Sequence, residues 1–335
     1  MADGPSILVI GPRWVGDMVM AQTLFSALKQ IHPDAAIDVM APGWAGPLVA
    51  RMPEVRAWID APFVRNTLQL GERRRIGRSL AGRYDRAIVM QGNLKAALVP
   101  WFAGIRRRSG YRGEMRFGLV NDMATLPPEL KRRTAEAFFQ LAGGGEFRPP
   151  RLSVDEANQA ALLAAHGLAR NGFAAFMPGA EFGPAKRWPE EKYAALARAL
   201  IAEGMPVVLL GSANDRPVTG AIARLAPGAL DLAGATSLVD AVDILAAARV
   251  AVTNDSGLMH IAAAVGAPVV AVYGSTSPEN TPPLTERREL VWLKLDCSPC
   301  HKRECPLGHL NCLRTLDVRL VEDAVRRAMG GGAPA

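Results

Sequence analysis

The sequence has little of what marks several protein classes. Aromatic residues make up only 6% of its 335 residues and no recognised nucleic-acid-binding motif is present, which argues against nucleic acid as a partner. The longest apolar run, from Leu258 on, is interrupted by His260 and Pro268 and is too short to span a membrane. The N-terminus, Met-Ala-Asp-Gly-Pro, lacks the basic and then apolar layout of a signal peptide. We therefore expect a cytoplasmic protein.

Cysteine is scarce as well, and all four cysteines lie near the C-terminus, in the pattern Cys297-x2-Cys300-x4-Cys305-x6-Cys312. The opening C-x-x-C has the spacing of a metal site, whereas the later spacings match no common zinc motif. A cytoplasmic chain should not depend on disulfides. We therefore favour reduced thiols that shape a loop and keep a structural metal site as the alternative. An Asp-x-Asp pair that could hold a divalent cation is also absent, so we expect neither a catalytic metal nor another cofactor.

The residues that are abundant describe an ordinary folded protein. Apolar residues make up 49% of the chain and charged residues 21%, and the length allows two cores. Strand-like runs such as residues 6–10 alternate with helical patterns such as residues 17–31, and the alternation restarts after the glycine- and proline-rich stretch 143–150. In the second half, Ser237 with Asp240 three residues later resembles a capping box and predicts that a helix starts there. The alternation predicts an α/β fold with two Rossmann-like, doubly wound domains, residues 1–150 and 151–335, that face a central cleft.

The net charge of +7 is placed unevenly along the chain. Residues 1–150 hold 21 Lys and Arg against 13 Asp and Glu, whereas residues 151–335 hold 18 against 19. The excess gathers in runs such as Arg73-Arg74-Arg75, Arg106-Arg107-Arg108 and Lys131-Arg132-Arg133. Charge runs usually form a solvated face. A phosphorylated acceptor or an anionic membrane surface would fit a one-sided patch equally well.

The stretch from Thr253 to His260 organises the second half. It follows a short apolar run with the β-branched character of a buried strand, and it opens an alanine-rich helical pattern. The first turn of such a helix offers backbone N–H groups and the positive end of its dipole, where phosphates bind readily. Ser256 and His260 share one face of that turn because they are four residues apart. The simpler alternative is that Asp255 or Ser256 caps the helix and His260 packs in the core.

Two further segments lie at predicted strand ends. Gly11-Pro-Arg-Trp-Val-Gly-Asp17 is neither a G-x-G-x-x-G motif nor a P-loop, but its Asp17 is the first acid of a helix at the expected cleft. The alternative role for Asp17 is to offset the helix dipole. The loop from Pro178 to Pro189 is rich in glycine and proline and holds Lys186 and Arg187 just before a helix. Such a pair could clamp a pyrophosphate.

Together these three segments resemble the ADP-heptose:lipopolysaccharide heptosyltransferases, and the cysteine-rich tail adds to the resemblance. It runs through nearly the whole chain and is nearest to the members that act on the first inner-core heptose. It implies a GT-B architecture with an N-terminal acceptor domain and a C-terminal ADP-sugar domain, whose last helix could pack back on the N-terminal domain. It also implies inverting, metal-independent transfer from ADP-L-glycero-D-manno-heptose to a heptosyl-Kdo2-lipid A type acceptor of a Gram-negative bacterium. The enzyme would contact the anionic cytoplasmic face of the inner membrane.

The resemblance assigns roles to individual residues. It implies that Asp17 is the catalytic carboxylate and that Lys186 binds the pyrophosphate. The donor-binding set is Gly179, Lys186, Gly211, Ser212, Asp215, Asp255, Ser256, Gly257 and His260. The acceptor set, for which the motifs say least, is Arg13, Trp14, Arg106, Arg107 and Arg108.

The expected mechanism follows from charge. The anomeric carbon becomes positive as ADP leaves, so the attacking hydroxyl needs a base, which Asp17 would supply. Lys186 and the helix that begins at Gly257 would stabilise the departing diphosphate, and the two domains would have to close. Three alternatives stay open: transfer to a different inner-core acceptor (Kdo or a later heptose), a non-catalytic nucleotide-sugar-binding protein, and a sugar-nucleotide epimerase of the same architecture.

Overall fold

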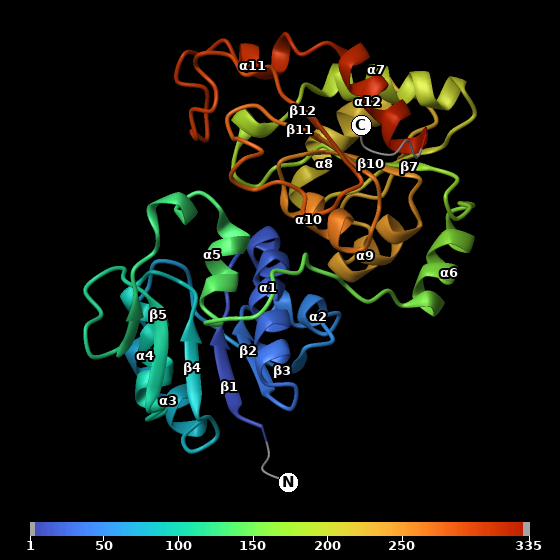
Figure 1. Ribbon diagram of the computed structural model, residues 1–335. Coiled ribbons are helices and arrows are strands. Elements are labelled where there is room, and N and C mark those ends of the chain that lie inside the picture. The colour runs from blue at the N-terminus through green and yellow to red at the C-terminus, as the bar shows by residue number, and fades with distance from the viewer. Residues whose placement is uncertain (1–3, 331–335) are drawn as a thin grey trace. The chain divides into compact units, whose positions relative to one another are not determined.

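The chain divides into two compact units, Met1–Pro150 and Arg151–Ala335, and the computed structural model describes residues 4–330. Each unit contains one six-stranded sheet flanked by helices (Figure 1). The boundary falls at the end of the glycine- and proline-rich stretch 143–150. Within that stretch Gly143 and Gly145 have φ angles of +86° and +91°, which glycine adopts without steric strain.

The first unit builds its sheet from residues 6–124. Its strands are β1 (Ser6–Ile10), β2 (Ala36–Ala41), β3 (Val55–Asp60), β4 (Arg86–Val89), β5 (Arg107–Tyr111) and β6 (Asp122–Ala124). Its helices are α1 (Val15–Ile31), α2 (Ala45–Val49), α3 (Leu70–Ser79), α4 (Leu94–Phe102) and α5 (Thr134–Gln140), with a 3₁₀ turn η1 (Pro128–Leu130).

The second unit repeats this alternation. Its strands are β7 (Ala174–Met177), β8 (Val207–Leu209), β9 (Leu230–Asp231), β10 (Val250–Asn254), β11 (Val269–Val272) and β12 (Arg288–Val291). Its helices are α6 (Glu156–Ala165), α7 (Glu190–Ala202), α8 (Arg216–Leu225), α9 (Leu238–Ala247), α10 (Gly257–Ala264), α11 (Asn311–Arg314) and α12 (Val318–Gly330). The 3₁₀ turns η2 (Pro184–Lys186) and η3 (Ala213–Asp215) precede α7 and α8.

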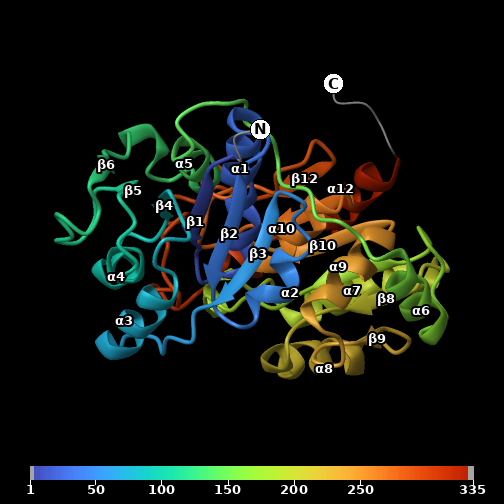
Figure 2. The ribbon, with the colours of Figure 1, turned by 90° about the horizontal axis from the view of Figure 1, so that it is seen from below.

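The two sheets have the same topology. The first runs β3-β2-β1-β4-β5-β6 (Figure 2) and the second β12-β11-β10-β7-β8-β9, with every strand pair parallel. The direction of strand addition reverses between β1 and β4 in one sheet and between β7 and β10 in the other. In such doubly wound sheets ligands bind beyond the carboxyl ends of the strands at this reversal point. The prediction of two Rossmann-like α/β domains is confirmed.

The core of the first unit explains why its central strands, β1 and β4, are nearly continuous apolar runs. Parallel strands covered on both faces bury alternate residues on each side. Leu8 and Val89 of neighbouring strands pack with Ile76 of α3 and Val99 of α4 on one face. From β1 the chain crosses to β2 on one side, and from β4 it crosses to β5 on the other side of the sheet. Because both crossovers are right-handed, α1 and α4 cover opposite faces.

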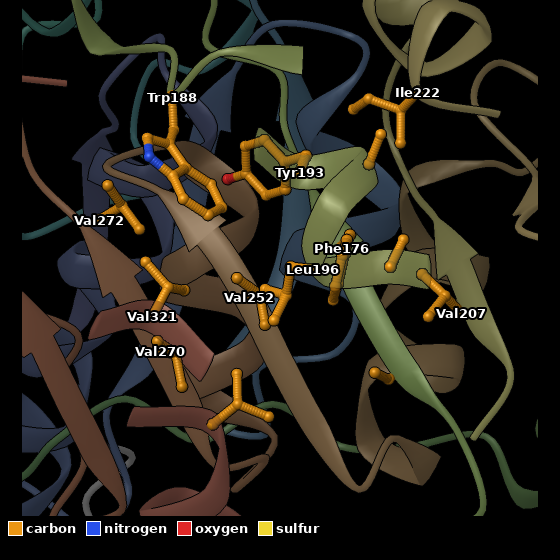
Figure 3. Close-up of a cluster of buried hydrophobic side chains, with 14 of the residues drawn as sticks. Phe176, Trp188, Tyr193, Leu196, Val207, Ile222, Val252, Val270, Val272 and Val321 are labelled. Carbon is orange, nitrogen blue, oxygen red and sulfur yellow. The ribbon is translucent and has the colours of Figure 1, made fainter. Parts of the chain in front are cut away.

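The core of the second unit is a cluster of large side chains around β7 and β10 (Figure 3). The Trp188 and Tyr193 rings meet edge to face at 5.0 Å, and both are fully buried. Val252 of β10 and Val321 of α12 complete the same cluster. Because the buried face of α12 packs on β10, β11, β12 and α7, that face is committed to its own unit. That the last helix could also pack back on the N-terminal domain stays a prediction.

Local signals in the sequence account for several element boundaries. The helix expected after Ser237 begins at Leu238, and the Ser237 hydroxyl accepts from the Asp240 backbone N–H at 3.2 Å while Asp240 accepts from the Ser237 N–H at 2.8 Å. This reciprocal pair is the predicted capping box. Between residues 4 and 330, no helix is both long and apolar enough to cross a membrane.

Candidate active site

Lys186 and Asp255 form a buried ion pair at the reversal point of the second sheet. Lys186 ends the turn η2, which follows β7, and Asp255 comes directly after β10. Lys186 Nζ lies 2.7 Å from Asp255 Oδ2, and the side chains are only 15% and 5% exposed. Because β7 and β10 are neighbours, their carboxyl ends bring together two segments that are 69 residues apart in sequence. Both residues belong to the predicted donor set, and the structure places them in contact.

Asn254, which is not among the predicted donor residues, holds these two segments together. Its Nδ2 donates to the Pro178 carbonyl oxygen at 2.6 Å. Its Oδ1 accepts from the Trp188 backbone N–H at 3.0 Å and from the Tyr193 hydroxyl at 3.1 Å. The side chain is fully buried, where an unpaired amide would be destabilising. Asn254 therefore fixes both ends of the lysine-bearing loop 178–189.

The start of α10 carries three more of the predicted donor residues, Ser256, Gly257 and His260. Ser256 is the N-cap residue, but its side chain makes no capping hydrogen bond, and its Oγ lies 3.3 Å from Thr253 Oγ1. The simpler alternative that Ser256 serves as a side-chain cap is therefore wrong. His260 is 5% exposed, and burial lowers its pKa to about 4 although Asp255 opposes the shift. The imidazole is consequently neutral near pH 7 and offers one hydrogen-bond donor and one acceptor.

In the loop after β8, the predicted donor residues are held together by the Asp215 carboxylate. Asp215 Oδ2 accepts from the Ser212 backbone N–H at 2.9 Å and from the Ser212 hydroxyl at 2.8 Å. The same carboxylate lies so close to the loop after β7 that a Cβ on Gly179 would meet its oxygen at 2.2 Å, and a Cβ on Gly211 would meet the Asp215 Cβ at 2.9 Å. Gly179, Gly211, Ser212 and Asp215 therefore form one packed corner. Asp215 shapes this corner through bonds inside the loop.

Asp17 stands at the reversal point of the first sheet. It lies in the first turn of α1, three residues after the N-cap Trp14, whose side chain makes no capping bond. Gly11 joins β1 to this turn, and a Cβ there would lie 2.9 Å from Met18 Cε, so a larger residue would require the Met18 side chain to shift. The Gln91 amide, directly beyond β4, donates to the Gly11 carbonyl oxygen at 2.6 Å. The turn that carries Asp17 is thus held between the ends of β1 and β4.

A basic pocket lies beside this turn, within the first unit. It is bordered by the segments that follow β1, β2, β3 and β4, including Arg13, Arg65, Arg73 and Lys95. Arg73 is 6% exposed; its Nε donates to the Leu68 carbonyl oxygen at 2.7 Å, and its guanidinium lies 3.8 Å from the centre of the Phe63 ring. Burial lowers the pKa of Arg73, and Arg13 lowers it further. Among the pocket-lining residues, Glu114 is the one carboxylate.

The five predicted acceptor residues do not lie together. Arg13 borders the basic pocket, and the exposed Trp14 ring stacks under Arg65 at 5.4 Å. The arginine run on β5 is used differently. Arg107 pairs with Asp122 at 2.8 Å. The Arg108 guanidinium donates to the carbonyl oxygens of Ile105, Leu119 and Gly118.

These contacts narrow the acceptor set. The partly buried Arg108 guanidinium is occupied by these carbonyl oxygens, whereas Arg107 is exposed and its charge is paired with Asp122. Arg106 is exposed on the chain immediately before β5. The run 106–108 was predicted as one binding patch, and the structure gives its three members different roles.

The cysteine segment, residues 297–312, follows β12. Its four cysteines are free thiols and border one small cavity together with His309 and Leu310. Within the described residues, no group of three or more His, Cys, Asp or Glu side chains is placed to hold a metal ion.

Comparison with known proteins agrees with this arrangement. The model of glycosyltransferase family 9 (heptosyltransferase) matches residues 73–311, which is more than half of the chain. The chain belongs to glycosyltransferase family 9. It is therefore a glycosyltransferase of the heptosyltransferase type, as its resemblance predicted.

Several family 9 relatives cover nearly the whole chain. Lipopolysaccharide heptosyltransferase 2 of Escherichia coli K12 is 46% identical, over 95% of this chain and 97% of its own. Lipopolysaccharide heptosyltransferase 1 of Pseudomonas aeruginosa is 30% identical, over 89% of this chain and 87% of its own. The solved structure of E. coli ADP-heptose lps heptosyltransferase II superposes with a TM-score of 0.86 at 41% identity, covering 97% of this chain and 98% of that one.

Some residues of this family 9 site could not have been found from motifs. Asn254 stands inside the predicted stretch, but its partners come from a loop that begins 76 residues earlier. Arg73 and Lys95 lie on helices whose charge looked like solvated surface, and both border the basic pocket. Thr281 Oγ1 lies 3.4 Å from Asp255 Oδ1 and belongs to a loop with no sequence signal of its own.

Proposed function

We propose that this family 9 enzyme transfers heptose from ADP-heptose to the first inner-core heptose of lipopolysaccharide. The observation that carries the proposal is the contrast among its relatives. Of two proteins from E. coli K12, the one named lipopolysaccharide heptosyltransferase 2 is 46% identical over 95% of this chain, and the one named lipopolysaccharide heptosyltransferase 1 is 25% identical over 81%. Proteins named lipooligosaccharide heptosyltransferase 2 from Campylobacter jejuni are 23% and 28% identical, so the contrast is drawn within one organism. Within one organism, the relative that shares an acceptor is expected to be the more similar one, because acceptor contacts are part of the selected sequence.

The second unit supplies the donor site. Lys186 Nζ and the backbone N–H groups at the start of α10 together provide positive charge for a diphosphate. As the glycosidic bond to ADP breaks, negative charge accumulates on the leaving diphosphate, and fixed donors stabilise it without reorganisation. Asp255 orients the lysine from the other side. We therefore assign Asp255 a positioning role, together with Asn254.

The first unit supplies the base. The attacking hydroxyl must lose its proton as the anomeric carbon becomes positive, and Asp17 is the carboxylate at the reversal point of the first sheet. The N-terminal end of α1 favours the ionised carboxylate, which is the form that accepts a proton. Attack on the face opposite ADP inverts the configuration at the anomeric carbon.

The basic pocket supplies acceptor recognition. A Kdo-containing acceptor carries carboxylates, and lipid A carries phosphates. Basic side chains with few carboxylates nearby can therefore bind the acceptor's anionic groups. Lys95, Arg65 and Arg13 border that pocket next to the turn that carries Asp17. We assign the acceptor's anionic groups to this pocket rather than to the arginine run on β5.

The charge asymmetry supports a peripheral membrane role. The first 150 residues carry 21 basic against 13 acidic residues, and an anionic leaflet attracts such a surface. We propose that the enzyme contacts the cytoplasmic face of the inner membrane, where its lipid-linked acceptor would be presented. Sedimentation with vesicles of phosphatidylethanolamine alone and with added phosphatidylglycerol tests this, and equal binding to both would contradict it.

One assay tests the proposed reaction. The pure protein is given ADP-heptose with lipopolysaccharide precursors that carry no heptose or one heptose, and ADP release is measured. We expect ADP to accumulate with the one-heptose precursor. Release with the heptose-free precursor would indicate transfer to Kdo instead. Binding of ADP-heptose without release in either case would indicate a nucleotide-sugar-binding protein, and a change of the heptose itself would indicate an epimerase.

A further inference from the structure

The cysteine segment is joined to the lysine-bearing loop by backbone hydrogen bonds. Ala185, the residue before Lys186, donates from its N–H to the Arg303 carbonyl oxygen at 3.1 Å. Its own carbonyl oxygen accepts from the Ser275 N–H at 3.2 Å. The approach is so close that a Cβ on Gly183 would lie 2.5 Å from the Arg303 oxygen. The position of the catalytic lysine therefore depends on where the cysteine segment lies.

Cys305 combines a reactive environment with a place next to this junction. It lies two residues after Arg303, and its Sγ accepts a hydrogen bond from the Leu310 N–H at 3.4 Å. That bond and the N–H groups of the turn after Cys305 lower the pKa of its thiol. The side chain is partly exposed. An accessible thiol that backbone donors stabilise as thiolate is the form that attacks disulfides.

The other three thiols border the same cavity but differ in reactivity. Cys312 is buried, and burial together with the neighbouring cysteines raises its pKa to about 11, so it is the least reactive. Cys297 and Cys300 are partly exposed and are separated by two residues. They are the accessible partners for Cys305.

We propose that the cysteine segment is a thiol-oxidation site in which Cys305 forms a disulfide with Cys297 or Cys300, and that this bond weakens donor binding. The four cysteines are free thiols that border one cavity, and joining two of their sulfurs at about 2 Å in the narrow geometry of a disulfide draws together the parts of the segment that carry them. The movement displaces the Arg303 carbonyl from Ala185 and with it the adjacent Lys186. The consequence for donor binding rests on the donor role of Lys186 proposed above.

The oxidant for the two protein thiols is a low-molecular-weight disulfide such as glutathione disulfide. The Cys305 thiolate attacks one sulfur of glutathione disulfide, and one glutathione thiolate leaves. A thiolate of Cys297 or Cys300 then attacks the Cys305 sulfur, and the second glutathione thiolate leaves. The two protein thiols lose two electrons and two protons in total, and glutathione disulfide is reduced to two glutathione molecules.

The experiment uses the full chain, purified with reductant and then treated with glutathione disulfide. Free thiols are counted, disulfides are located by peptide mapping, and ADP affinity is measured by calorimetry. We expect the loss of two of the four thiols, a Cys305–Cys297 or Cys305–Cys300 bond, and ADP binding weakened about tenfold. Dithiothreitol should restore the affinity. Cys305→Ser, which keeps an acceptor for the Leu310 N–H, should bind ADP normally and should not respond to oxidant.

Several results would overturn the proposal. These are four intact thiols after treatment of the folded protein, a disulfide that leaves ADP affinity unchanged, or about one equivalent of zinc or iron per chain in protein purified without chelator. Reduced protein that does not bind ADP would overturn both this proposal and the donor site. Reduced protein that binds ADP but transfers no heptose would refute the proposed function alone, because the thiol count and ADP affinity do not depend on turnover.

Discussion

The two reversal points share a topology but differ in chemistry. In the second unit the ends of β7 and β10 meet in a closed polar network in which Lys186 pairs with Asp255 and every polar atom of Asn254 has a partner. In the first unit the segments after β1 and β4 border a pocket lined by Arg13, Arg65, Arg73 and Lys95 with one carboxylate, Glu114, and the adjoining turn leads to Asp17. One strand order thus supports two chemically different sites, to which we assign the donor and the acceptor.

In a fold made of two similar units, the strand order and the residues at the strand ends contribute differently to function. The strand order fixes where a site lies, because the carboxyl ends of neighbouring strands meet there. The residues placed at those ends decide what the site binds. The following predictions test whether the two sites are as different as their side chains indicate.

The largest effect is expected at Asp17. Asp17→Asn keeps the shape of the side chain but removes its ability to accept a proton, so kcat should fall by roughly 10²–10⁴. If Asp17 only offset the helix dipole, Asn would substitute well, since the two residues cap helices about equally. Steady-state heptosyl transfer measures this. Asp34→Asn, an exposed carboxylate between α1 and β2, is the matched control and should keep wild-type turnover.

The buried ion pair should dominate the stability of the donor site. Asp255→Asn leaves the Lys186 ammonium without its carboxylate, and the free energy of unfolding should fall by about 3 kcal/mol. Urea denaturation followed by circular dichroism measures this. Adding Lys186→Met removes the orphaned charge, so the double variant should recover part of the loss. Lys186→Met alone is measured for comparison. If the double variant loses as much stability as the two single variants added together, the pair is not coupled.

His260 should make stability depend on pH. Burial lowers its pKa to about 4, whereas a histidine in the unfolded chain titrates near 6.5. Below pH 6.5 the unfolded state therefore binds a proton that the folded state excludes. The contribution is complete above pH 6.5 and is lost progressively as the pH falls toward 4, by up to ~1.4 kcal/mol per pH unit.

Urea denaturation at pH 7 and pH 5 tests this dependence. The wild type should lose about 2 kcal/mol more than His260→Gln between these pH values. His32→Gln, an exposed histidine directly after α1, should lose as much as the wild type. An equal loss in wild type and His260→Gln would contradict the burial argument.

The smallest effect is expected in the basic pocket. Lys95→Gln removes one charge that faces the acceptor, and acceptor KM should rise about tenfold while ADP-heptose KM stays unchanged. The wild-type acceptor KM should also rise with salt, because screening weakens such contacts. Arg106→Gln, exposed before β5, should leave acceptor KM near the wild-type value. A larger rise in acceptor KM for Arg106→Gln than for Lys95→Gln would instead assign acceptor binding to the arginine run 106–108.

Local chemistry made much of the fold predictable. The strand at residues 6–10 and the capping box at Ser237 were read correctly because apolar runs and cap residues act over a few positions. The three site segments were found because each follows a strand, and parallel strands end at the same edge. Fold and family therefore followed from short stretches.

Contacts across long sequence separations were not predictable. Asn254 depends on Pro178 and Tyr193, which reach it only after the second core has formed. The run 106–108 reads as one cationic patch, yet the Arg108 guanidinium is held by carbonyl oxygens of the loop before β6. Which arginines bind a ligand and which bind their own chain is decided by packing, and no motif records it.

The division of labour between the two sites can be measured by titrating ADP calorimetrically into wild type, Asp17→Asn and Lys186→Gln. Lys186→Gln should weaken ADP binding by about tenfold to hundredfold, because a charge-assisted contact to the diphosphate is lost. Asp17→Asn should bind ADP as the wild type does. Wild-type ADP affinity in Lys186→Gln, or an equal loss in Asp17→Asn, would contradict the assignment of the donor to the second unit and the base to the first.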